Sequence, residues 1–159
     1  MVSAGFDSRV VAEVTPALKD LYGKVAYLLV GLKHIAAYAP PSLTVTIDGT
    51  DYRAAWAIVS KARHYGGKFL LAAEAGLARP EFVVSLFAHS GRLGLLRDIC
   101  VIGLNRASAT THIKTIKGTS VAIKSDRPEL AQADGDAIGL LPLSIALSPQ
   151  PLQLIMPGE

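Results

Sequence analysis

The spacing of apolar residues changes near residue 42 from a helical period to an alternating one, and no other feature constrains the fold as much. Between residues 25 and 36, apolar side chains recur every three or four positions, and Pro40-Pro41 ends that run. Residues 43–47 then alternate apolar and polar side chains, which is typical of a strand with one buried face. The sequence therefore predicts a few helices combined with a body built mostly of strands.

Short apolar runs separated by turn signals predict the strands of this body. Asp48-Gly49 and Asp134-Gly135 are dipeptides that favour two-residue hairpin turns. Residues 52–61 are apolar on both faces, so we expect a central strand that forms a hairpin with residues 43–47. Further strands are expected at residues 82–87, at 111–117 turning through Gly118-Thr119 into 120–124, at 130–133, at 143–147 and at 152–156.

Helices are predicted at three places. The first follows Asp7-Ser8, a capping pair, and Thr15-Pro16 breaks or restarts it. The second is the amphipathic run after Gly23, and the third extends over residues 91–104 with Ser90 as its N-cap. The apolar face of the third helix consists of Leu93, Leu96, Ile99 and Cys100.

Length and composition fit one domain. The chain has 159 residues, half of them apolar, and we expect a single domain over residues 1–159. Many short strands with a few helices favour an α+β, β-rich class with a two-layer β-sandwich-like body. The net charge of +3 comes from scattered basic residues, and this pattern does not predict nucleic-acid binding.

Cysteine content and hydropathy indicate the cellular setting. Cys100 is the only cysteine, so a disulfide framework is excluded, and its apolar neighbours predict a buried small hydrophobe. The N-terminal residues lack the pattern of a secretory signal, and prolines interrupt the apolar stretch from residue 138 to 157. We expect a soluble, cytoplasmic protein that contacts membranes only peripherally.

Residue chemistry alone leaves the function open. The four histidines have no metal-ligand spacing, so no metal site is predicted. Tyr65-Gly66-Gly67-Lys68 has glycines that suit either approach to a phosphate or a turn between strands, and the turn is favoured. Asp134-Gly135-Asp136 fits a hairpin turn with a solvated carboxylate. In the alternative interpretation, Asp136 is a general base that removes the proton of an alcohol.

Short motifs in a particular order carry a family resemblance. They are Gly5-Phe6-Asp7, Lys19-x-x-x-Gly23-x-x-Ala26-Tyr27, residues 60–67, Ala73-Glu74-Ala75 with residues 82–84, residues 132–136 with Pro142, and Met156-Pro157. In this order they resemble the C-terminal domain of the diacylglycerol kinase catalytic-domain family. That family comprises bacterial lipid kinases related to sphingosine and ceramide kinases and, more distantly, to NAD kinases.

The resemblance implies a role in phosphoryl transfer to a lipid. In that family an N-terminal α/β domain with a Gly-Gly-Asp-Gly motif holds ATP, and the β-rich domain supplies the lipid pocket. The motif does not occur here. The chain is therefore expected to be the substrate-binding half of an ATP-dependent lipid kinase acting on diacylglycerol or a sphingoid-type lipid. It would be inactive alone and would need an ATP-binding domain in cis or trans. ATP and magnesium would be bound mainly by that domain, and no cofactor is expected in this chain alone.

The resemblance also implies roles for particular residues. Asp136 stands where the family usually has glutamate as catalytic base, and its side chain is one methylene shorter. Asp134 and Gly135 are implied to contact substrate. Asp7 matches a carboxylate near the lipid headgroup, although it equally suits a helix cap. Arg79 stands in a loop where relatives place an aspartate that helps to bind magnesium, so that metal site is expected to be missing.

Two further interpretations stay open. The domain is alternatively a non-catalytic lipid-binding module that keeps an apolar pocket without chemistry. Kinship with NAD kinase activity is weaker, because the apolar helix after Gly23 suits a lipid better than a soluble dinucleotide. Homodimer formation is compatible with either interpretation.

Overall fold

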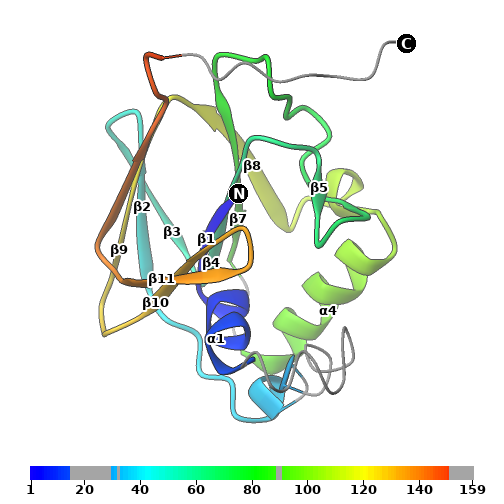
Figure 1. Cartoon of the computed structure of the whole chain (residues 1–159). Coiled ribbons are helices and arrows are strands. Elements are labelled where there is room, and N and C mark those ends of the chain that lie inside the picture. The colour runs from blue at the N-terminus through cyan, green and yellow to red at the C-terminus, as the bar shows by residue number, and fades with distance from the viewer. Residues whose placement is uncertain (15–29, 32, 89–90, 151–159) are drawn as a thin grey trace.

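The computed structural model describes residues 1–14, 30, 31, 33–88 and 91–150. Its main element is a six-stranded antiparallel sheet, here called the large sheet, with the strand order β11-β10-β1-β4-β7-β8 (Figure 1). These strands are β1 (Val2–Ala4), β4 (Trp56–Ser60), β7 (Phe82–Phe87), β8 (Ile113–Gly118), β10 (Leu130–Ala133) and β11 (Asp136–Leu140). The N-terminal strand β1 thus lies between β4 and β10, a strand from the last third of the chain.

A four-stranded antiparallel sheet, here called the small sheet, packs against one face of the large sheet. Its order is β12-β9-β2-β3, formed by β12 (Leu143–Ala146), β9 (Ser120–Ser125), β2 (Leu43–Ile47) and β3 (Thr50–Ala54). Leu43, Val45 and Ile47 are buried, as their alternation predicts, and they pack with Ala57 and Val59 of β4 between the sheets. The α+β, β-sandwich-like fold class is confirmed.

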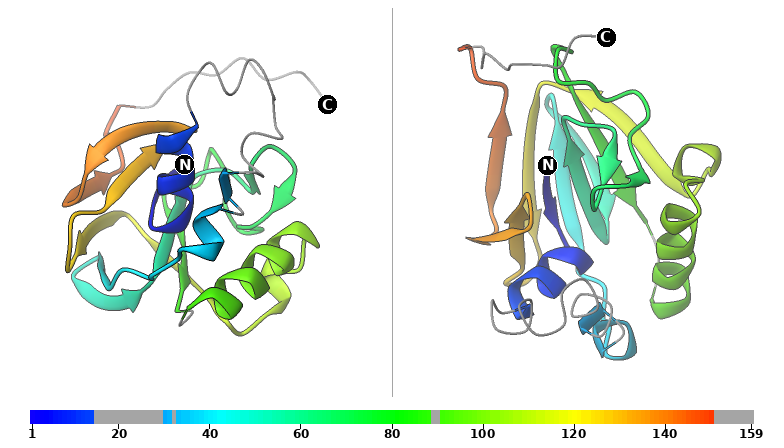
Figure 2. Two further views of the ribbon diagram at one scale, coloured as in Figure 1. Left: turned by 90° about the horizontal axis from the view of Figure 1, so that it is seen from below. Right: turned by 45° about the vertical axis from the view of Figure 1, so that its right-hand side comes forward.

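Helices cover the opposite face of the large sheet (Figure 2). The labelled helices are α1 (Phe6–Glu13) and α4 (Arg92–Gly103), a 3-10 turn spans Ala107–Ala109, and residues 30, 31 and 33–36 are helical. Trp56 and Ile58 of β4 face this side and form a second core with Phe6, Phe87 and Leu95. The rings of Trp56 and Phe87 stack with centroids 4.3 Å apart. β4 is thereby buried on both faces, as predicted for a central strand.

A small hairpin lies beside the end of α4. Its strands are β5 (His64–Tyr65) and β6 (Phe69–Leu70). Gly66 and Gly67 turn the chain with φ angles of 56° and 87°, a region that favours glycine, so the predicted glycine turn is confirmed. The amide of Leu70 donates to Oδ1 of Asn105 at 2.6 Å, which ties this hairpin to the residues just after α4.

Two connections predicted from the sequence are wrong. An apolar strand pattern does not indicate to which sheet a strand belongs. Residues 52–61 do not form one strand, since the chain leaves the small sheet after β3 and enters the large sheet at β4. The crossing point, Ala55, donates its amide to the carbonyl of Phe87 at 2.8 Å. Gly118-Thr119 likewise connects β8 of the large sheet to β9 of the small sheet and closes no hairpin. The predicted Asp48-Gly49 and Asp134-Gly135 hairpins are confirmed.

The predicted apolar face of α4 is wrong as a core face for Leu93, Leu96 and Cys100, and only its Ile99 packs against the core. Leu95 and Ile102 are buried together with Asp98, whereas Leu93 and Leu96 are exposed. Cys100 is exposed as well and is not the buried hydrophobe that its neighbours suggest. The helix is apolar around most of its circumference, so periodicity could not distinguish its inner face from its outer face.

Helix caps differ from those predicted where the structure describes them. Gly5 is the N-cap of α1, and Ser8 lies inside the helix, where its hydroxyl donates to the Gly5 carbonyl at 2.9 Å. Asp7 is likewise within the first turn and does not cap. The Ser90 cap, the Thr15-Pro16 break and the strand at residues 152–156 lie outside the described residues. None of the described helices has both the length and the apolar character that crossing a bilayer requires.

We predict that Gly5→Ala destabilises the domain more than Gly49→Ala does. Both glycines have a positive φ, 117° and 85°, so both variants are strained by about 1 kcal/mol. A Cβ at Gly5 would in addition lie 2.8 Å from the Ala55 carbonyl oxygen. A Cβ at Gly49 would have no atom within 4 Å other than those of the adjacent residues in the chain. Urea denaturation should give a loss of at least about 2 kcal/mol for Gly5→Ala. Equal losses for the two variants would contradict the close approach.

Candidate functional site

A cleft of about 720 Å³ lies between α1, the β5–β6 hairpin and the β10–β11 turn. Its walls are largely apolar. The described apolar side chains that line it are those of Met1, Phe6, Val10, Val11, Ala62, Tyr65 and Phe69. Polar groups enter from three sides, since Asp7 lies on α1, His64 lies on β5, and Gln132, Asp134 and Gly135 lie at the end of β10. The cleft therefore combines long apolar walls with a small polar end, which is typical of a site for a small organic ligand.

The Asp7 carboxylate is the buried polar centre of this cleft. Its side chain accepts hydrogen bonds from four donors that come from four different strands. Oδ1 accepts from Nε1 of Trp56 at 2.9 Å. Oδ2 accepts from the hydroxyl of Ser3 at 2.7 Å, from Nε2 of Gln132 at 3.2 Å and from the hydroxyl of Tyr65 at 3.3 Å. Asp7 is only 5% exposed, so these bonds replace most of its hydration.

Burial raises the pKa of the Asp7 carboxyl above its ordinary value. The hydrogen bonds from Ser3, Trp56, Gln132 and Tyr65 act in the opposite direction because they favour the charged form, but desolvation is the larger effect. Burial also raises the pKa of the Tyr65 hydroxyl well above its usual range, with a further contribution from the Asp7 charge. Tyr65 therefore stays a neutral donor. The four donors fix the orientation of the Asp7 carboxyl group.

Gln132 connects this carboxylate to the β10–β11 turn. Its Nε2 donates to Ser3 at 2.6 Å and to Asp7, and its Oε1 accepts from the Gly135 amide at 2.9 Å. The side chain is 1% exposed and uses both ends of its amide. Asp134 and Gly135 have φ angles of 48° and 96°, the geometry of a two-residue hairpin turn. The position of this turn thus depends on the Asp7 network.

The structure brings together three of the four site residues predicted from the sequence. Asp7, Asp134 and Gly135 line the same cleft, although Asp134 is exposed and forms an ion pair with the Met1 amine at 2.5 Å. Asp136 is the first residue of β11, is exposed, and is not among the described residues that line the cleft. Asp136 directly follows the β10–β11 turn and belongs to β11, which is an edge strand of the large sheet.

The comparisons with known proteins give the family. A model of the YegS C-terminal NAD kinase beta sandwich-like domain matches residues 1–156. The chain belongs to this family. The resemblance to the C-terminal domain of the diacylglycerol kinase-like proteins is therefore confirmed. No curated protein matches the chain.

Solved structures agree with this family assignment at the level of the fold. A diacylglycerol kinase from Bacillus anthracis str. Sterne has 20% identity and a TM-score of 0.60, with 91% of this chain and 47% of that chain covered. A candidate diacylglycerol kinase from the same strain has 18% identity and a TM-score of 0.65, over 91% and 48%. The chain thus spans about half the length of these structures.

The loop that resembles the family's magnesium site does not fit that ion here. The ammonium of Lys61 donates to the backbone carbonyl of Arg79 and, at 3.3 Å, to that of Glu81. Lys117 of β8 pairs with Glu74 at 2.8 Å and with Glu81 at 3.4 Å. Cationic side chains thus already hold the oxygens of this loop. No group of three or more histidine, cysteine or acidic side chains suited to a metal occurs among the described residues.

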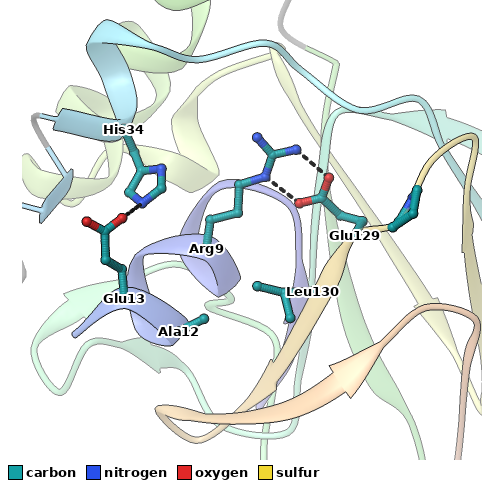
Figure 3. Close-up of a pocket in the computed structure, with 7 residues that line it drawn as sticks. Arg9, Ala12, Glu13, His34, Glu129 and Leu130 are labelled. Carbon is teal, nitrogen blue, oxygen red and sulfur yellow. Dashed lines mark hydrogen bonds and ion pairs between the residues drawn. The ribbon is translucent and has the colours of Figure 1, made fainter. Parts of the chain in front are cut away.

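A second, shallower hollow of about 470 Å³ lies between α1, His34 and the residues just before β10 (Figure 3). Nε and Nη2 of Arg9 donate to the two carboxylate oxygens of Glu129, each at 2.5 Å, and the Glu129 side chain is 1% exposed. Nε2 of His34 pairs with Glu13 at 2.7 Å. We assign the Arg9–Glu129 pair to holding α1 against the start of β10, and the Glu13–His34 contact to joining α1 to the helical segment that contains His34.

The residues that surround Asp7 are not evident from the sequence. Trp56, Tyr65, Gln132 and Ser3 are separated by up to 129 positions, and only the strand order β10-β1-β4 brings most of them together. One signal was available, since Trp56 is the only tryptophan and precedes the aliphatic run Ala57-Ile58-Val59. A buried indole needs a partner for its N–H group, and the nearest buried acceptor is Asp7.

We predict that Asp7 gives the domain a pH-dependent stability. The pKa of Asp7 is about 3.9 in the unfolded chain and is raised in the folded one. At pH values between the unfolded and the folded pKa, the folded state therefore binds more protons than the unfolded state. The free energy of unfolding should therefore fall as pH rises from about 4 through the folded pKa, by up to about 1.4 kcal/mol per pH unit.

Asp7→Asn removes this titration and isolates its contribution. We expect the difference in unfolding free energy, wild type minus Asp7→Asn, to decrease with rising pH and then to level off. Urea denaturation of both proteins between pH 4 and 7 measures it. A difference that increases with pH would show that the hydrogen bonds outweigh desolvation and that the pKa of Asp7 is lowered.

Proposed function

We propose that this domain is the acceptor-binding half of an ATP-dependent lipid kinase. The observation that carries the proposal is a cleft whose apolar walls end at the buried carboxylate of Asp7. Phe6, Val10 and Phe69 offer surface to acyl or alkyl chains, because such chains gain free energy by leaving water. Asp7 is placed to accept a hydrogen bond from a hydroxyl or an amine of the headgroup. Membership of the family and the half-length match to diacylglycerol kinase structures support the same function.

The reaction requires a base that a lipid hydroxyl can reach. In the proposed step, Asp136 accepts the proton of that hydroxyl while the hydroxyl oxygen attacks the γ-phosphoryl group of ATP, and ADP leaves. Asp136 is exposed beside the cleft, so a second domain facing the β10–β11 turn would enclose it with the nucleotide. ATP and its magnesium would come with that domain. The acceptor is a diacylglycerol or a sphingoid-type lipid.

A non-catalytic lipid-binding module is the second candidate, since the same cleft supports it. The two candidates differ in chemistry and not in lipid binding. Substitutions in the cleft test lipid binding, and substitution of Asp136 tests the chemistry.

We predict that Val11→Asp weakens lipid binding at least tenfold. Val11 lines the cleft from α1 and is only partly buried, so a carboxylate there opposes an acyl chain without replacing a core residue. Titration of the purified chain with a fluorescent short-chain diacylglycerol or sphingosine measures the dissociation constant. Ile138→Asp is the matched control, because Ile138 is 48% exposed on β11 and is not among the described cleft residues. Equal weakening by both variants would argue against the cleft.

We predict that Asp136→Asn lowers kcat for lipid phosphorylation by at least about a hundredfold, because the amide cannot accept the proton. The assay supplies the nucleotide-binding domain in cis or in trans and measures transfer of labelled phosphate from ATP. Asp51→Asn, an exposed substitution on β3, is the control. Unchanged turnover of Asp136→Asn would remove Asp136 as the base. Lipid binding without any phosphorylation by the wild-type assembly would favour the binding module.

A further inference from the structure

The outer face of α4 is apolar and exposed. Leu93, Leu96, Cys100 and Leu104 follow one another at spacings of three or four residues, so they share one side of the helix and its continuation. Leu93 is 84% exposed, Leu96 44% and Leu104 69%. The opposite side holds the buried Leu95, Asp98 and Ile102. We call the four exposed residues the outer face of α4.

The position of α4 leaves this face accessible. In the right-hand view of Figure 2, α4 stands at the edge of the molecule, and the sheets lie on its inner side. The exposed leucines are not scattered singly, as is normal on soluble proteins, but form a row along one helix. Such a row requires a partner that is itself apolar at the point of contact.

Charges beside the outer face indicate which partner fits. Three exposed arginines accompany α4: Arg92 at its start, Arg97 in its middle and Arg106 just after its end. Asp98 is the only acidic residue between positions 91 and 118, and its side chain is 1% exposed and bonds to Arg97 at 2.9 Å. The exposed charged side chains between positions 91 and 118 are therefore all basic. An apolar row flanked by arginines matches a bilayer that carries anionic headgroups above an apolar interior.

The location of the outer face relative to the cleft supports a bilayer as the occupant. Asn105, next to Leu104, bonds to Leu70 of the β5–β6 hairpin, and Tyr65, Gly66 and Phe69 of that hairpin line the cleft. A membrane in contact with α4 would therefore lie near one wall of the cleft. This step rests on the proposed function, in which the cleft receives an acceptor that dissolves in a bilayer and not in water.

We propose that the outer face of α4, with Arg92, Arg97 and Arg106, is a docking surface for an anionic lipid bilayer. Apolar side chains would enter the interfacial layer of the bilayer while the arginines contact its phosphate and carboxylate groups. Both contributions are needed, because a row of a few leucines is short and each arginine adds only a modest attraction that salt screens.

Vesicle flotation tests this surface directly. The purified chain is mixed with vesicles of phosphatidylcholine alone or with 30% phosphatidylglycerol, without any diacylglycerol or sphingoid lipid. We expect the wild-type chain to bind the anionic vesicles. The affinity should fall at least tenfold in Leu93→Gln/Leu104→Gln and about tenfold in Arg92→Gln/Arg106→Gln. The matched control is Ile138→Gln/Leu140→Gln, which replaces two exposed apolar residues on β11 and should bind within twofold of wild type. Circular dichroism confirms that each variant is folded.

Cys100 offers a second, local readout. As the only cysteine, it can carry a single polarity-sensitive dye on the outer face of α4. Insertion predicts a blue shift of the emission when anionic vesicles are added, and none with phosphatidylcholine alone. An unshifted emission, or equal flotation of Leu93→Gln/Leu104→Gln and wild type, would overturn the proposal. So would a homodimer in solution that this double variant dissociates, because the outer face would then belong to a second copy of the chain.

The test separates this proposal from the proposed function. The vesicles contain no acceptor lipid, so Val11→Asp should float like wild type even if the cleft binds lipid. Conversely, Leu93→Gln/Leu104→Gln should bind a soluble short-chain lipid like wild type. Failure of flotation alone removes the docking surface, and failure of short-chain binding alone removes the cleft as a lipid site.

Discussion

The buried carboxylate of Asp7 is the interaction on which the arrangement of this domain depends. It joins α1 to β1 through Ser3, to β4 through Trp56, to β5 through Tyr65 and to β10 through Gln132. A buried charge is costly unless it is hydrogen-bonded, and here each donor is available only when its strand is in place. Loss of one strand from the set would leave the carboxylate partly unsatisfied. The network therefore favours one arrangement of these elements over other compact ones.

The same network determines the shape of the cleft. Trp56 presents its N–H group to Asp7 while its ring stacks on Phe87, so one side chain connects the polar centre to the helix-side core. Gln132 extends the network to the Gly135 amide and so fixes the turn that forms the opposite wall. Gly5 permits the close approach of the β1–α1 connection to Ala55, which lets Asp7 reach these partners. Fold and candidate site share the same contacts.

The sequence predicted features that depend on neighbours in the chain. Asp48-Gly49, Asp134-Gly135 and the glycines at 66 and 67 were assigned to turns because the left-handed conformation has a local chemical requirement. The crossings at Ala55 and Thr119 were missed because sheet membership depends on pairing with strands far along the chain. β1 has three residues, too few for a period to appear. Of the Asp7 network, the sequence supplied the acid but not its donors, since their convergence is a property of topology.

Burial separates the two acids that the family resemblance connects to the lipid. Asp7 lies inside the cleft, where Oδ2 accepts from three protein donors and Oδ1 from one, so Oδ1 keeps a lone pair with which the proposed headgroup contact can form. Asp136 has the opposite setting, exposed on an edge strand beside a rigid turn. A general base must lie within hydrogen-bond reach of the proton that it removes, and an exposed carboxylate beside the cleft leaves room for a substrate hydroxyl. In the proposed function, Asp136 is therefore the base and Asp7 the carboxylate that recognises the headgroup.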